Sequence, residues 1–86
     1  MTIIDRIVSV FKKPAFDFYV DGVKYTSNVA KTNGLNIKFI AGVDEFQSLY
    51  LETDGPFDEQ VFYGTAVDLS AKPLRFFTAP RVIGGG

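Results

Sequence analysis

The fold is decided first by residues 16–27, which read FDFYVDGVKYTS. Phe16, Phe18 and Val20 alternate with the residues between them, and this is the period of a half-buried strand. Asp21-Gly22 is a strong tight-turn pair, and residues 23–27 alternate again on the way back. This stretch predicts an antiparallel β-hairpin.

A strand-like stretch near the C-terminus runs into a glycine tail. Pro73 opens it, Leu74 and Phe76 fall on one face, and the residues between and after them fall on the other. The periodicity stops after Thr78, where we expect Pro80 to end the sheet and hold the tail extended. The last residues are Ala79, Pro80, Arg81, Val82, Ile83, Gly84, Gly85 and Gly86.

Residues 32–43 fit a helix and a strand equally well. Alternate positions from 35 to 43 are apolar, as in a strand, whereas Ile37, Ile40 and Ala41 keep helical spacing. Thr32 or Asn33 is a suitable helix N-cap, and Gly42 is a suitable end. The pattern alone leaves both alternatives open.

The region that follows predicts more β-structure. Residues 47–52 form a strand with Leu49 and Leu51 on one face, and Asp54-Gly55-Pro56 forms a turn. Residues 58–63 carry a short strand. Residues 64–71 look irregular, with Leu69 as the inward anchor.

The N-terminus predicts a short amphipathic helix over residues 2–13, which Pro14 ends. Such a helix covers an edge of the core or frays in solution, or else it docks on a partner or touches a membrane. We therefore expect an N-terminal extension over residues 1–14, a folded domain over 15–78 and a tail over 79–86. The apolar positions of the helix are Ile3, Ile4, Ile7, Val8 and Phe11.

The composition excludes several function classes. The 86 residues suffice for one domain, and 47% of them are hydrophobic, so we expect a core that needs no disulfide or other cross-link. The chain has no Cys and no His, which removes thiolate chemistry and the usual proton-transfer side chain. We expect no enzyme activity, no metal site and no bound cofactor. A net charge of −1 argues against nucleic-acid binding. No segment has the length or pattern of a membrane span or an export signal, so we expect a cytoplasmic protein.

The order of elements resembles the ubiquitin-like β-grasp, an α+β fold with the order β-β-α-β-β and a flexible C-terminal tail. Residues 74–81, together with Thr32-Asn33-Gly34 and Ala41-Gly42, are similar to bacterial multi-ubiquitin-type domains. Those domains are small modifiers encoded beside activating enzymes, conjugating enzymes and deconjugating peptidases, in systems linked to antiphage defence. The resemblance implies that residues 32–43 are the helix.

The resemblance also implies a role for the tail. An activating enzyme that uses ATP and magnesium would adenylate the terminal carboxylate, and a cysteine would take it as a thioester before transfer to a target protein. Gly86 is the expected point of attachment, with Gly85 as the fallback and Gly84 beside it, because glycine lets two active sites close around the backbone. The activating and conjugating enzymes would recognise the preceding segment, Pro80, Arg81, Val82 and Ile83.

A second candidate site is a surface patch of Tyr50, Arg75 and Phe77. Alternation turns these residues outward, and their arrangement is similar to the recognition patch of ubiquitin. Exposed aromatic residues are good interface anchors. The alternative is that the N-terminal helix folds back and covers them.

Two other functions stay open. A sulfur carrier has the same fold, tail and adenylation, but receives sulfur on its terminal carboxylate. A non-covalent β-grasp interaction domain or a small phage structural protein would have an inert tail, since terminal glycine runs also occur as frayed ends.

Overall fold

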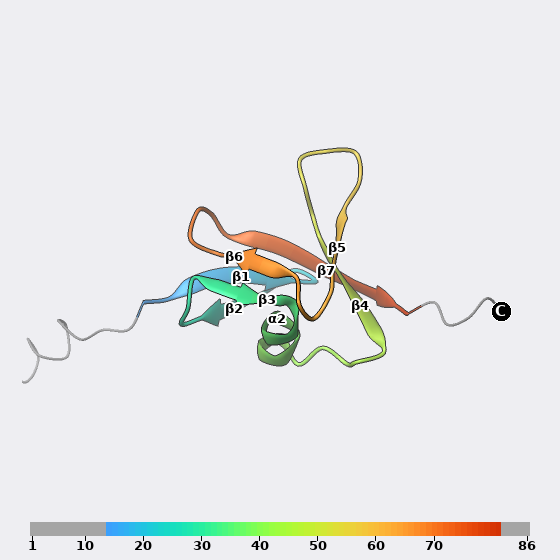
Figure 1. Ribbon diagram of the computed structural model, residues 1–86, viewed down its shortest axis with the longest axis horizontal. Coiled ribbons are helices and arrows are strands. Elements are labelled where there is room, and N and C mark those ends of the chain that lie inside the picture. Colours follow the sequence, from blue (N-terminus) through green and yellow to red (C-terminus); the bar gives the residue numbers. More distant parts are fainter. Residues whose placement is uncertain (1–13, 82–86) are drawn as a thin grey trace, which may run out of the picture.

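The computed structural model describes residues 14–81, in which one helix and seven strands follow one another. The predicted helix at residues 2–13 therefore lies outside the described residues. Figure 1 shows the helix on one side of a twisted sheet. In chain order the elements are β1 (Phe16–Val20), β2 (Val23–Ser27), β3 (Lys31–Asn33), α2 (Gly34–Ala41), β4 (Gln47–Leu51), β5 (Glu59–Val61), β6 (Ala66–Asp68) and β7 (Leu74–Pro80).

The main sheet has five strands in the order β2-β1-β7-β4-β5. β1 and β7 are parallel, and the other neighbours are antiparallel. The C-terminal strand therefore lies in the centre of the sheet, between the first strand of the hairpin and β4. A mixed five-stranded sheet with one helix is compatible with a β-grasp-like α+β fold.

The predicted hairpin is confirmed. β1 pairs with β2 from Phe16 opposite Ser27 to Val20 opposite Val23. Asp21 and Gly22 both have positive φ, 52° and 81°. Two positive φ values are what a type I′ turn requires, and that turn matches the twist of the strands.

Residues 34–41 are helical, so the structure settles what the pattern left open. The Asn33 side chain caps the first turn by accepting a hydrogen bond from the Asn36 N–H at 2.9 Å. At the other end Gly42 has φ of 66°, and the N–H groups of Gly42 and Val43 donate to the Phe39 and Lys38 carbonyls. This is a Schellman ending, which favours glycine at its left-handed position.

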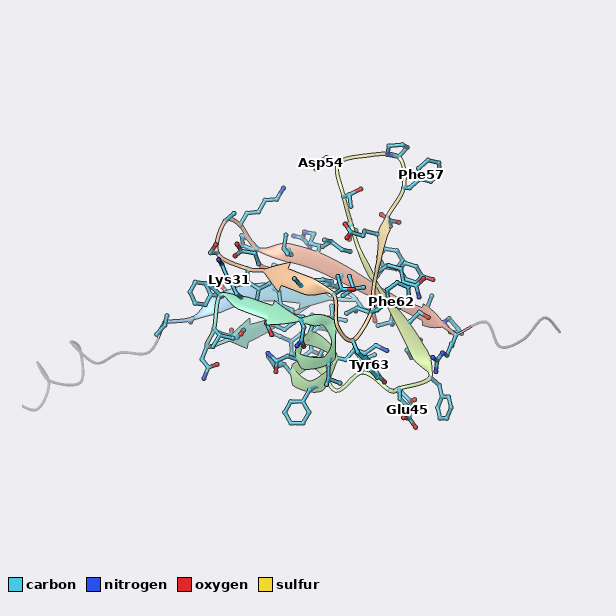
Figure 2. All side chains as sticks on the ribbon, in the orientation of Figure 1. Lys31, Glu45, Asp54, Phe57, Phe62 and Tyr63 are labelled. Carbon is cyan, nitrogen blue, oxygen red and sulfur yellow. The ribbon has the colours of Figure 1, made fainter. Side chains whose placement is uncertain are left out.

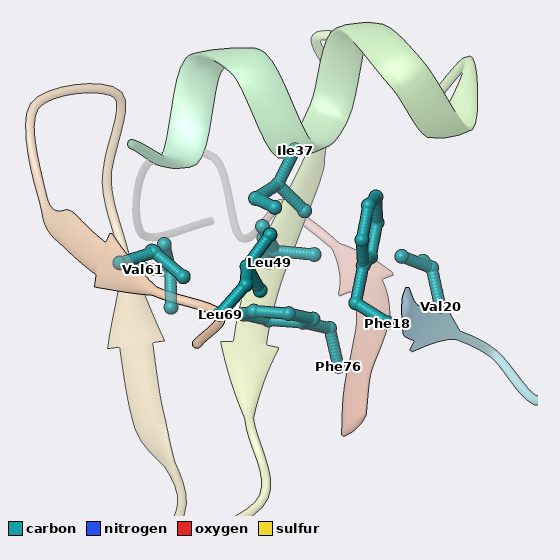
Figure 3. Packing of buried hydrophobic residues seen from close by; sticks show 8 residues of the cluster. Phe18, Val20, Ile37, Leu49, Val61, Leu69 and Phe76 are labelled. Atoms are coloured by element: carbon teal, nitrogen blue, oxygen red, sulfur yellow. The ribbon is translucent and has the colours of Figure 1, made fainter. Parts of the chain in front are cut away.

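The core lies between α2 and the inner face of the sheet. Figure 3 shows Ile37 pointing from the helix toward Leu49 and Phe76. Because one helix face is buried, Leu35 and Phe39 face away and are 51% and 82% exposed. The buried hydrophobic residues are Phe18, Val20, Ile37, Leu49, Val61, Val67, Leu69 and Phe76.

The prediction for residues 64–71 was partly wrong. Leu69 is buried as expected, at 3% exposure. Ala66–Asp68, however, form β6, which pairs antiparallel with β3 in a separate two-stranded sheet. Only three residue pairs make this ladder, and so short a segment has too few positions for a period-2 pattern to be recognised.

Candidate functional site

The base of the tail is held by the centre of the main sheet. β7 pairs with β1 through residues 74–76, and with β4 from Phe76 opposite Leu51 to Pro80 opposite Gln47. The Arg81 N–H then donates to the Phe46 carbonyl at 3.0 Å. The sheet therefore holds the chain up to Arg81, at the far end of the red strand in Figure 1.

The last strand was expected to end at Thr78, with a break at Pro80, but β7 continues to Pro80. The reason is the side toward which its nitrogen points. The Thr78 N–H donates to the Asp21 carboxylate on the β1 side, and the Arg81 N–H donates to the Phe46 carbonyl on the β4 side. Since backbone groups alternate along a strand, residue 80 shares the side of Thr78, where β1 has already ended. A proline is tolerated there because the ladder needs no donor.

Asp21 fastens the hairpin turn to this end of β7. Its carboxylate accepts from the Thr78 N–H at 2.9 Å and from the Thr78 hydroxyl at 2.6 Å. Its own N–H donates to the Phe76 carbonyl at 3.0 Å. Three hydrogen bonds thus replace the ladder on the β1 side of β7, where β1 turns away.

Of the predicted tail residues, the structure describes Pro80 and Arg81. Both are exposed. Val82, Ile83, Gly84, Gly85 and Gly86 lie outside the described residues, and their role in attachment stays a prediction.

The predicted patch of Tyr50, Arg75 and Phe77 comes together on the outer face of the sheet. Tyr50 lies directly opposite Phe77 on the neighbouring strand, and their rings stack with centroids 5.3 Å apart. Both aromatic residues are half-buried and Arg75 is exposed. Residues 2–13 lie outside the described residues, so the alternative that their helix covers this face stays a prediction.

Sequence reasoning missed Tyr19 as a member of this face. It lies opposite Arg75 in the parallel pair of β1 and β7, and the Arg75 guanidinium carbon is 4.6 Å from its ring centroid. The alternation of residues 16–20 does turn Tyr19 outward. The parallel pairing that joins it to Arg75, however, brings together residues more than fifty positions apart and leaves no local signal.

Carboxylate and metal chemistry point to no site in the described residues. Asp68 has a pKa below the ordinary carboxyl value, because the hydroxyl and the N–H of Ser70 both donate to it, but it is exposed at the end of β6. Within residues 14–81 no three His, Cys, Asp or Glu side chains gather to hold a metal ion. No helix in the described residues is long and apolar enough to cross a membrane.

Comparisons with protein-family models, with curated proteins and with solved structures find no match for this chain.

Proposed function

We propose that this chain is a ubiquitin-like β-grasp modifier that is attached to target proteins through its C-terminal glycine. An activating enzyme would use ATP and magnesium to adenylate the carboxylate of the mature end, and a conjugating enzyme would carry it as a thioester. A peptidase would process or remove it. The resemblance to bacterial multi-ubiquitin-type domains adds the proposal that the system serves antiphage defence.

The observation that supports this proposal is the course of β7. A central strand is the most firmly held part of a sheet, and this one leads directly to the tail through Arg81. A tail whose base is fixed in the sheet suits a substrate that other proteins must grip and draw into an active site.

The chemistry of the chain agrees with the role of a substrate. Without His or Cys it has no side chain that would normally form or break a thioester near neutral pH. Glycine at the reacting end removes the side chains that would collide with two enclosing active sites. The reactive cysteines would belong to the partners.

The decisive experiment is expression of an N-terminally tagged full chain in its native host. We expect adducts of higher mass that survive denaturing electrophoresis, with the terminal glycine joined to target residues in peptide mass spectra. The matched control is the same chain without Gly84, Gly85 and Gly86, which should form none. Full-length protein that forms no adduct, and no thioester with an active activating enzyme, would refute the proposal.

The same preparation tests the alternatives. A sulfur carrier would show an intact mass in which one oxygen is replaced by sulfur. A non-covalent interaction domain would keep its cellular function after the three glycines are removed.

A further inference from the structure

A pocket of about 340 Å³ lies beside the base of the tail. It is bounded by the start of β4, by the residues that follow β5, by Lys38 of α2 and by Arg81. We name it the β4–β5 pocket. Figure 2 shows two of its residues, Glu45 and Tyr63, near the start of β4.

The pocket exists because β5 leaves β4 early. Their ladder ends with Leu49 opposite Val61. The chain after Val61 bonds to the start of the helix instead, since the Tyr63 and Thr65 carbonyls accept from the N–H groups of Leu35 and Gly34 at 3.2 and 3.1 Å. Within the described residues, the first part of β4 therefore has no strand opposite it on this side.

Lys38 bridges the resulting gap. Its ammonium donates to the Gln47 carbonyl at 2.6 Å and lies 5.2 Å from the centroid of the Tyr63 ring. A lysine ammonium carries three donors, and the Gln47 carbonyl uses one of them. The others remain for a group that enters the pocket.

The charge of the pocket favours an anion. Among residues 14–81 the ion pairs are Lys24–Asp17 and Lys72–Asp54, and neither includes Lys38 or Arg81. Two cations therefore line the pocket against the single carboxylate of Glu45.

The apolar surface of the pocket is aromatic. Phe62 and Tyr63 are 62% and 50% exposed, whereas Leu49 and Val61 are buried behind them, and Gln47, Ser48 and Gln60 add polar groups. Aromatic and arginine side chains are the residues that protein interfaces favour. The volume is near the lower end of the ~300–1,000 Å³ range of small-molecule sites, so it suits one or two side chains.

We propose that the β4–β5 pocket binds a carboxylate side chain next to an aromatic one, presented by the activating enzyme that takes the tail. This inference rests on the proposed function. Arg81 belongs both to the pocket and to the base of the tail, so a protein that grips the tail reaches the pocket. The carboxylate would bind Lys38 and Arg81, and the aromatic ring would pack against the exposed rings of Phe62 and Tyr63.

The test is an NMR titration of the full chain with the peptide acetyl-Asp-Phe-amide. We expect the amide signals of Gln47, Tyr63 and Arg81 to shift. The neutral peptide acetyl-Asn-Phe-amide should bind about tenfold more weakly, because charge-assisted hydrogen bonds are the stronger kind. Lys38→Met should reduce binding of the acidic peptide by a similar factor, and Lys24→Met should leave it unchanged.

Two variants keep the test valid if Lys38→Met does not fold. Lys38→Arg retains the cation and should bind the acidic peptide nearly as well as wild type, whereas Glu45→Gln removes the competing carboxylate and should bind it more tightly. Equal binding of the two peptides, or shifts confined to other surfaces, would overturn the proposal.

Removal of Gly84, Gly85 and Gly86 separates this inference from the proposed function. The shortened chain should bind the acidic peptide as well as the full chain, although it forms no adducts. Adducts without peptide binding would refute the pocket alone, and peptide binding without adducts would refute the modifier role alone.

Discussion

Gly34→Ala tests whether the approach of α2 to the end of β5 holds the fold together. A Cβ atom at residue 34 would collide with the Phe62 carbonyl oxygen and would lie 2.8 Å from Val61 Cγ1. Real Cβ atoms essentially never come so close to another atom, and a backbone carbonyl cannot rotate away as a side chain does. The substitution must therefore push the Val61–Phe62 segment away from the helix.

Two effects of opposite sign decide the magnitude. Alanine in place of glycine in a helix gains up to about 1 kcal/mol, part of it through the unfolded chain. Overpacking costs about 1–3 kcal/mol, and more where the backbone must move. The displacement also strains the hydrogen bonds from Gly34 and Leu35 to the Thr65 and Tyr63 carbonyls. We expect a net loss of roughly 2 kcal/mol, a large part of the ~4–13 kcal/mol expected for 86 residues.

The measurement is urea unfolding followed by far-UV circular dichroism, since the chain has no Trp. Gly64→Ala is the matched control. It has ordinary φ, and an added Cβ would meet nothing within 4 Å, so its stability should stay within about 0.5 kcal/mol of wild type. A Gly34→Ala variant as stable as wild type would refute the close approach of α2 to the Val61–Phe62 segment. It would also refute the explanation that this approach draws the chain after β5 away from β4 and so opens the β4–β5 pocket.

Three further predictions concern β7 and its surroundings. Pro80→Ala should change the free energy of unfolding by less than about 0.5 kcal/mol, because the nitrogen of residue 80 points to the side where β1 has already ended; a larger loss in urea unfolding would contradict that orientation. A double-mutant cycle of Tyr50→Ala and Phe77→Ala should give a coupling free energy of about 0.5–1.5 kcal/mol for the stacked rings, and additive losses would disprove it. Ser70→Ala should raise the pKa of Asp68 toward the ordinary carboxyl value, because it removes the hydroxyl that donates at 2.6 Å; an unchanged NMR titration midpoint would exclude that cause.

Local chemistry explains why parts of the fold were predictable. The Asp21-Gly22 turn follows from the two positive φ values that a tight hairpin needs, and the inward positions of Leu49 and Phe76 follow from strand alternation. Tyr50 and Phe77 were assigned to the outer face for the same reason. Each of these features depends on residues within a few positions of one another.

The other features of the fold depend on contacts between residues that lie far apart in the sequence. Pro80 looks like a break beyond the last strand until Asp21, nearly sixty residues earlier, is found bonded on the β1 side of Thr78. Ala66–Asp68 form a strand only because Lys31–Asn33 lie beside them. Lys38 looks like one more solvated lysine until the separation of β4 and β5 brings the Gln47 carbonyl within 2.6 Å of its ammonium.

The sequence by itself determined the hairpin, the face that each long strand buries, and the absence of His and Cys that assigns the proposed chemistry to partners. Side-chain periodicity and turn geometry are local, so they can be recognised without the fold. The tertiary structure alone decided that residues 34–41 are helical, that the sheet holds the tail as far as Arg81, and that a positively charged pocket lies beside it. These features depend on which strands become neighbours, and burial of one common core selects those neighbours.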